Sequence, residues 1–178
     1  MTNRIVQFTG IMLAALVTGV FWGTWFTLTR SLDSFSAAEF LHIGKTIIAN
    51  VALPMRVLMP ASLLVMLWAI WLYPAKHSTG FYLLLAGFML MLATLLITLL
   101  VEVPIDNDIR RWTVETLPVD WESKRLTWKH FHALRTLTSV AALSAFLWGI
   151  LLPSGRARRE AFLEIHGAAG QREGHRLS

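Results

Sequence analysis

The chain has 178 residues, of which 55% are hydrophobic and only 15% are charged, and its mean hydropathy is +0.55. This balance is more apolar than that of a soluble domain, and the length allows one compact unit. Cysteine is absent, which excludes disulfides, thiolate metal ligands and a cysteine nucleophile. The net charge of +5 in so apolar a chain favours contact with lipid headgroups over binding of nucleic acid.

Four apolar runs are long enough to cross a hydrocarbon core, which takes about 20 helical residues. In chain order they cover residues 5–28, 46–72, 81–103 and 131–152. Because a backbone inside lipid must satisfy its own hydrogen bonds, each run is expected to be a helix. The sequence therefore predicts an all-α integral membrane protein, in which residues 1–152 form a four-helix bundle and residues 153–178 form a basic, flexible tail.

The connections between the runs differ in character. Ser36 and Glu39 have the form of a capping box, so the second helix is expected to begin near Ala37. A short turn covers residues 73–80, and a longer polar stretch covers residues 104–130. The long stretch has nearly balanced charges and contains tryptophans, so we expect a structured polar loop that folds over the mouth of the bundle.

Four spans place both termini on the same side of the membrane. A count of Lys and Arg near the spans slightly favours the loops being cytoplasmic. Arg4, just before the first span, and the basic cluster at Arg156, Arg158 and Arg159 favour the termini instead. We expect a multi-pass protein with cytoplasmic termini.

Polar residues inside the spans mark candidate sites, because each is costly in hydrocarbon. His132 and Arg135 lie one helical turn apart near the membrane entry of the fourth span, on a face shared with Trp128. His42 and Arg56 recur at helical spacing along the second span, on a stripe expected to face the interior.

Structural roles compete with these functional ones. Glu39 is foremost a helix cap. Arg56 lies between Pro54 and Pro60, where a guanidinium can satisfy carbonyls that prolines leave free. Tryptophans at the ends of spans commonly anchor the protein at the lipid interface.

A spaced signature covers the end of the third span and the start of the fourth. It consists of Val103-Pro104-Ile105-Asp106-Asn107, Trp112, Asp120-Trp121, Arg125, Trp128, His132, Arg135 and Thr136. This pattern resembles that of the anthrone oxygenase-like family of small four-span membrane proteins, in which a "VP-[LI]-N-N" turn precedes a "W-x-x-x-H-x-x-R-T" segment. The chain departs from it at Asp106, where asparagine is common, and at His130-Phe131, where an asparagine often precedes the histidine.

The resemblance implies a membrane-embedded oxygenase that acts on a lipophilic, anthrone-like aromatic, with no cofactor. His132 would remove the acidic proton of the substrate, and the resulting phenolate would react with dioxygen. Arg135 and Asn107 would stabilise the developing oxyanion. The residues expected to contact the flat substrate are Trp22, Trp25, Trp112, Trp128, His42 and Arg56.

Two alternatives remain open. Haem or a metal ion could bind through His42 and His132, since Glu39 and His42 form one Glu-x-x-His motif of the kind that builds di-iron sites in pairs. Alternatively, the chain is a non-enzymatic membrane module that binds a lipid, an anion or a partner membrane protein, with Arg56 as a mid-bilayer contact. The expected partners are membrane lipid and a lipophilic small molecule, and a homo-oligomer is a further possibility.

Overall fold

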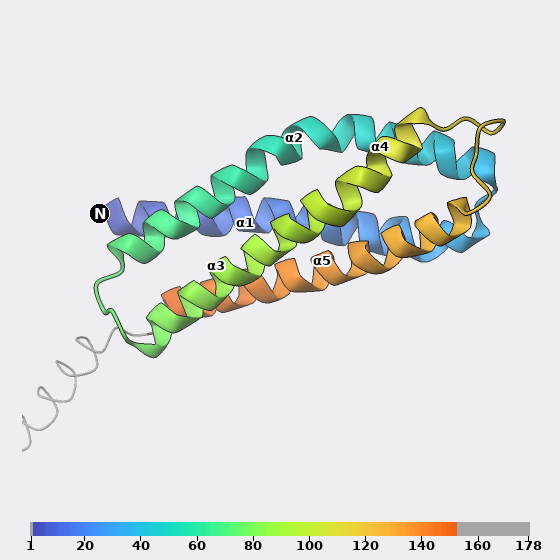
Figure 1. The fold of residues 1–178 in the computed structure, drawn as a ribbon. Coiled ribbons are helices and arrows are strands. Elements are labelled where there is room, and N and C mark those ends of the chain that lie inside the picture. The colour runs from blue at the N-terminus through green and yellow to red at the C-terminus, as the bar shows by residue number, and fades with distance from the viewer. Residues whose placement is uncertain (1, 153–178) are drawn as a thin grey trace, which may run out of the picture.

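The computed structural model describes residues 2–152, and within that range every regular element is a helix. The elements are α1 (Thr2–Thr27), the 3-10 turn η1 (Thr29–Ser34), α2 (Ala37–Leu72), α3 (Thr79–Ile97), the π turn η2 (Thr98–Glu102), α4 (Val103–Arg111) and α5 (Trp121–Leu151). Because α3, η2 and α4 are continuous, they form one rod, called the third rod below, and the molecule is a bundle of four rods (Figure 1). Each rod is long and apolar enough to cross a membrane. This confirms the all-α, four-helix membrane bundle.

The second helix begins where the sequence predicts. The backbone N–H of Glu39 donates to the Ser36 hydroxyl, and the Glu39 carboxylate accepts from the Ser36 backbone N–H at 2.8 Å. This capping box satisfies two helix-end donors and is worth about 0.5–2 kcal/mol. Glu39 is therefore a cap, and α2 continues from it through Pro54 and Pro60 to Leu72.

The third rod contains a widened turn at η2. There the backbone N–H of Val103 donates to the carbonyl of Thr98, five residues back. Pro104 follows directly, and it has no N–H and crowds the carbonyl four residues before it in a regular α-helix. The widened turn accommodates this proline and directs Glu102 into the bundle, where its side chain is fully buried. Such π turns are rare in proteins, and those that occur are often found at functional sites.

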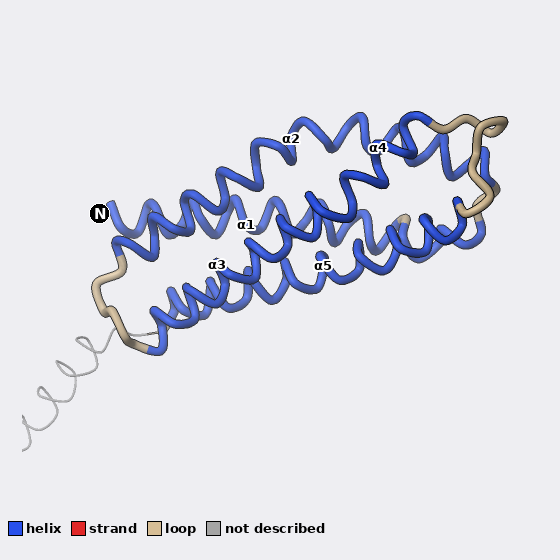
Figure 2. The backbone as a smooth tube through the Cα atoms, viewed as in Figure 1, coloured by secondary structure: helices blue, strands red, loops and turns tan. Residues whose placement is uncertain are grey.

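The polar stretch at 104–130 is mostly helical, and only its middle is a loop. α4 extends the third rod to Arg111, because Ile105 and Ile109 lie four residues apart and are both buried, while Arg110 and Arg111 are exposed. α5 begins at Trp121, well before the apolar run that marks its span. The structured loop is therefore residues 112–120 (Figure 2).

Polar contacts hold this loop against the helix ends. Lys45 of α2 donates to the Trp112 carbonyl at 2.6 Å. Lys124 of α5, which pairs with Asp108 of α4 at 2.7 Å, lies 5.1 Å from the centroid of the Trp112 ring. The Trp112 ring packs with a buried cluster at this end of the bundle. The connection is thus ordered by contacts to three helices, while its action as a lid stays a prediction.

The opposite end of the bundle, called the terminal end below, is apolar and tightly packed. α3 and α5 approach so closely at Gly87 that an added Cβ would lie 2.8 Å from both the Ala142 carbonyl oxygen and the Phe146 amide nitrogen. Small residues permit such close approach of helices in membranes. The main core surrounds this contact and includes the fully buried Met66 and Phe146.

The start of α1 and the end of α5 lie at the same end of the bundle (Figure 1). That both termini lie on one side of the membrane, and that this side is cytoplasmic, stay predictions. The expected basic tail at 153–178 lies outside the described residues.

Candidate functional site

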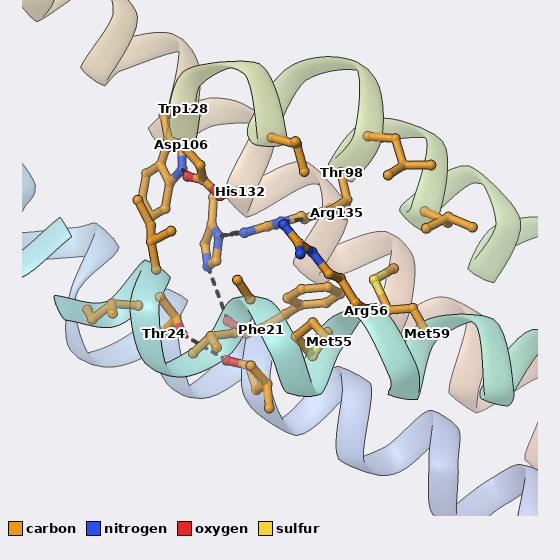
Figure 3. Close-up of a pocket in the computed structure, with 18 of the residues that line it drawn as sticks. Phe21, Thr24, Met55, Arg56, Met59, Thr98, Asp106, Trp128, His132 and Arg135 are labelled. Atoms are coloured by element: carbon orange, nitrogen blue, oxygen red, sulfur yellow. Dashed lines mark hydrogen bonds between the residues drawn. The ribbon is translucent and has the colours of Figure 1, made fainter. Parts of the chain in front are cut away.

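A cavity of about 340 Å³ lies in the loop-side half of the bundle, between α1, α2, the third rod and α5 (Figure 3). This volume is within the range of small-molecule sites. Most of the wall is apolar, with Phe21 of α1, Met55 and Met59 of α2 and Leu95 of α3 as examples. The polar side chains that line it are Thr24, Arg56, Thr98, Asp106, Asn107, Arg110, Trp128, His132 and Arg135.

A buried ion pair stands behind one end of this cavity. The Arg135 Nη2 atom lies 3.0 Å from the Glu102 Oε2 atom, and the Glu102 side chain is fully buried. Among the described residues, neither oxygen of Glu102 has a well-aligned hydrogen-bond donor, so the contact is one of charge and the carboxylate keeps free acceptor capacity. The widened turn η2 is what brings this carboxylate to α5. Removal of either partner would leave an uncompensated charge in a water-poor interior.

His132 is held at both ring nitrogens. Its Nδ1 atom lies 2.7 Å from Arg135 Nη2 and 3.2 Å from Arg135 Nε. Because a guanidinium can only donate, Nδ1 carries the lone pair, and the ring proton is on Nε2. Nε2 donates to the Phe21 carbonyl of α1 at 3.3 Å. The imidazole is therefore neutral, and its lone pair points at Arg135.

Trp128 and Asp106 complete the polar wall. The Trp128 indole stacks on the His132 ring, with centroids 4.8 Å apart and an angle of 13° between the planes. Its Nε1–H donates to Asp106 Oδ1 of α4 at 3.1 Å. On the other side, the Arg135 guanidinium lies 4.6 Å from the centroid of the Phe21 ring. Side chains of α1, α4 and α5 thus fix the imidazole and the guanidinium in one arrangement.

Arg56 approaches the cavity from α2 and differs from the other polar residues. Its side chain points into the cavity (Figure 3) and is exposed. Within residues 2–152 it makes no ion pair, and no hydrogen bond of its side chain meets normal geometry. The role of satisfying carbonyls near Pro54 and Pro60 is therefore not what this guanidinium does in the structure.

The structure brings five of the nine predicted site residues to this cavity: Asn107, Arg56, Trp128, His132 and Arg135. It does not bring the other four there. His42 and Trp22 are exposed, Trp25 packs beside Trp22 with ring centroids 5.3 Å apart, and Trp112 lies at the loop.

Of the stripe expected to face the interior, Arg56 lines the cavity although it is exposed, whereas His42 is exposed and does not line it. The buried face of α2 carries Ile48, Met55 and Met59 instead.

Sequence reasoning missed two contributors to the site. In the sequence Asp106 stands out only as a departure from the family pattern, although its position one residue before Asn107 is a usable signal. Phe21 contributes its backbone carbonyl to His132 and its ring to Arg135. No sequence pattern marks it, because any residue type offers a carbonyl.

The metal alternative requires His42 and His132 to line one site, and the structure does not bring them together. His132 lines the cavity and His42 does not. In the described part of the chain, no group of three or more His, Cys, Asp or Glu side chains is placed to hold a metal ion.

Comparison with known proteins places the site within a described family. The sequence model of a family described as anthrone oxygenase matches residues 48–145, which is more than half of the chain. The matched segment includes most of α2, the whole third rod and most of α5, so every cavity element except α1 falls within it. No curated protein and no solved structure matches the chain.

Proposed function

Because the chain belongs to the anthrone oxygenase family, we propose that it is a membrane oxygenase that oxidises a lipophilic, anthrone-like aromatic in the cavity between α2 and α5. The supporting observation is one cavity with largely apolar walls, at one end of which His132 and Arg135 meet. Apolar walls suit a flat aromatic ring, and a few convergent polar groups orient it. A substrate soluble in lipid would reach such a site without crossing water.

The first step is removal of a proton from the acidic CH₂ group of the anthrone. In the proposed complex the substrate carbonyl oxygen takes the hydrogens that Arg135 now donates to His132. This exchange frees the Nδ1 lone pair to accept the proton, and Arg135 stabilises the phenolate oxygen that forms. Asn107 accepts from Arg110 at 3.4 Å through Oδ1, which leaves its NH₂ group as a second donor to that oxygen.

The second step uses dioxygen as the oxidant. The electron-rich carbon of the phenolate forms a bond to one oxygen atom, and the proton held by His132 passes to the other, which gives a hydroperoxide. Loss of the remaining C–H proton then breaks the O–O bond. The carbon becomes a carbonyl, and the second oxygen leaves as water. The balance is one CH₂ group plus O₂ giving one C=O group plus H₂O, with no electrons from the protein.

Oxygen uptake by the protein in lipid nanodiscs tests this proposal, with 1,8-dihydroxyanthrone as the substrate and the absorbance of the anthraquinone as a second signal. The wild type is expected to exceed the spontaneous rate. His132→Ala is expected to lower kcat by about 10²- to 10⁴-fold, the usual contribution of a positioned base.

His130→Ala is the matched control, because His130 is exposed on the same helix and does not line the cavity. It is expected to keep the wild-type rate. A wild-type rate equal to the spontaneous one would refute the reaction. Full activity in His132→Ala with loss in Asp106→Asn would instead move the proton acceptor to the carboxylate.

A further inference from the structure

Arg56 lies half way along a membrane-spanning helix. It is flanked by nineteen residues of α2 on one side and sixteen on the other, out of 36. The apolar run of this span covers residues 46–72, so at about 1.5 Å per residue Arg56 lies about 15 Å from its nearer end, beyond the reach of an arginine side chain. Snorkelling to the headgroups therefore does not explain this residue, and an arginine at such depth is among the most costly residues to insert.

The local backbone does not use the guanidinium either. Pro60 has no N–H, so the Arg56 carbonyl four residues earlier lacks its helical donor. A guanidinium that served the prolines would donate to such a carbonyl. No such bond occurs within residues 2–152, where the Arg56 side chain has neither an ion pair nor a hydrogen bond of normal geometry.

The charges around the cavity leave an excess of one positive charge. Three guanidiniums line it, those of Arg56, Arg110 and Arg135, against the single carboxylate of Asp106. Glu102 lies behind the wall and pairs with Arg135. Even with both carboxylates ionised, three cations face two anions. Arg135 pairs with Glu102, and Arg110 is exposed near the end of α4. Arg56 is thus the cation deep in a span that has no ion pair within residues 2–152.

The same residue stands at the opening of the cavity. The lining residues that are themselves exposed include Arg56 and Pro60 on α2 and Leu99 on the third rod, which is 52% exposed. These residues lie on different rods, so the cavity opens between α2 and the third rod. Both rods cross the bilayer, so this opening faces lipid, and Arg56 points from it into the cavity (Figure 3).

We propose that Arg56 binds the carboxylate of an aromatic acid that enters the cavity from the bilayer between α2 and the third rod. This inference rests on the proposed function and narrows its substrate class to anionic aromatics. A guanidinium holds a carboxylate through two parallel N–H···O bonds, which are stronger than neutral ones. The apolar walls at Met55, Met59 and Leu95 then receive the rings.

Two quinones that share one ring system test the proposal: anthraquinone-2-carboxylate and 2-(hydroxymethyl)anthraquinone. Neither can be oxidised by the proposed reaction, so binding is measured apart from turnover. Quenching of tryptophan fluorescence in phosphatidylcholine nanodiscs gives the Kd, with Trp128 in the cavity wall as one reporter. The wild type is expected to bind the carboxylate about tenfold or more tightly than the alcohol, as charged hydrogen bonds contribute.

Variants at position 56 test whether Arg56 causes the preference for the carboxylate. Arg56→Gln is expected to remove it while the affinity for the alcohol stays unchanged, and Arg56→Lys is expected to keep only part of it, because a point charge lacks the planar fork. Arg111→Gln is the control, since Arg111 is exposed on α4 and does not line the cavity. It is expected to keep the full preference.

Three results would overturn the inference. The first is equal affinity of the wild type for both quinones, and the second is an unchanged preference in Arg56→Gln. The third is competition by phosphatidylglycerol in the nanodisc that requires Arg56, which would assign the guanidinium to a lipid phosphate. The oxygen-uptake assay is independent of these measurements. If it fails while the carboxylate preference persists, the reaction is wrong and the anion site stands.

Discussion

The two ends of the bundle hold the same helices together by opposite means. At the terminal end, α3 and α5 meet at Gly87, where an added Cβ would lie 2.8 Å from backbone atoms of the partner helix. At the loop end, the same pair of rods is joined through two long charged side chains, Glu102 and Arg135, at 3.0 Å. The cavity thus comes from polar side chains that space the rods, and not from poor packing.

The two ends of the bundle therefore have different roles. Two helices that touch at a glycine pack well at only one distance from each other. The terminal end therefore fixes how the rods lie relative to each other. The polar end is then free to carry charges, a π turn and a cavity that cost stability locally. A rigid frame of this kind is what keeps a site of several residues in one geometry.

Loss of Glu102 should be the most damaging single change at the polar end. Glu102→Ala leaves Arg135, which is only 8% exposed, without its anionic partner. We expect the free energy of unfolding to fall by about 3–5 kcal/mol, measured by denaturant titration in detergent micelles with circular dichroism. The double variant Glu102→Ala with Arg135→Leu should recover part of the loss, because it leaves no buried charge. A single variant as stable as wild type would show that the pair does not hold this end.

An added methyl group at the terminal end should have the next largest effect on the free energy of unfolding. Gly87→Ala places a Cβ 2.8 Å from the Ala142 carbonyl, so α3 and α5 must move apart, at a cost of about 1–3 kcal/mol. Gly23→Ala is the matched control, because no atom of residues 2–152 lies within 4 Å of its added Cβ. The same titration compares the two. Equal effects of the two alanines would contradict the view that this contact sets the helix separation.

The smallest effect is expected when one hydrogen bond is removed from the polar wall. Trp128→Phe keeps an aromatic ring beside His132 but loses the Nε1–H that donates to Asp106. We expect a loss of about 0.5–1.5 kcal/mol in unfolding and a lower rate of oxygen uptake, since the wall that holds the imidazole is loosened. Trp148→Phe, at a position that is 61% exposed, should change neither quantity.

Much of the fold follows from short-range pattern. Each of the four apolar runs falls on a different one of the four rods, and the capping box at Ser36 marks the start of α2 to the residue. Where pattern failed, a competing local signal was present. Ile105 and Ile109 make α4 amphipathic, so the charged residues around them lie on a helix face and not in a loop.

Helical spacing alone placed His132 and Arg135 on one face, because residues one turn apart project together whatever surrounds them. Which acid would pair with Arg135 depended on the π turn that directs Glu102 inward. The partner of His132 Nε2 is a carbonyl 111 residues away in the sequence. That Arg56 would line the same cavity with no protein partner is likewise a result of packing. Spacing along one helix is a local property, whereas these partners are chosen only when four rods come together.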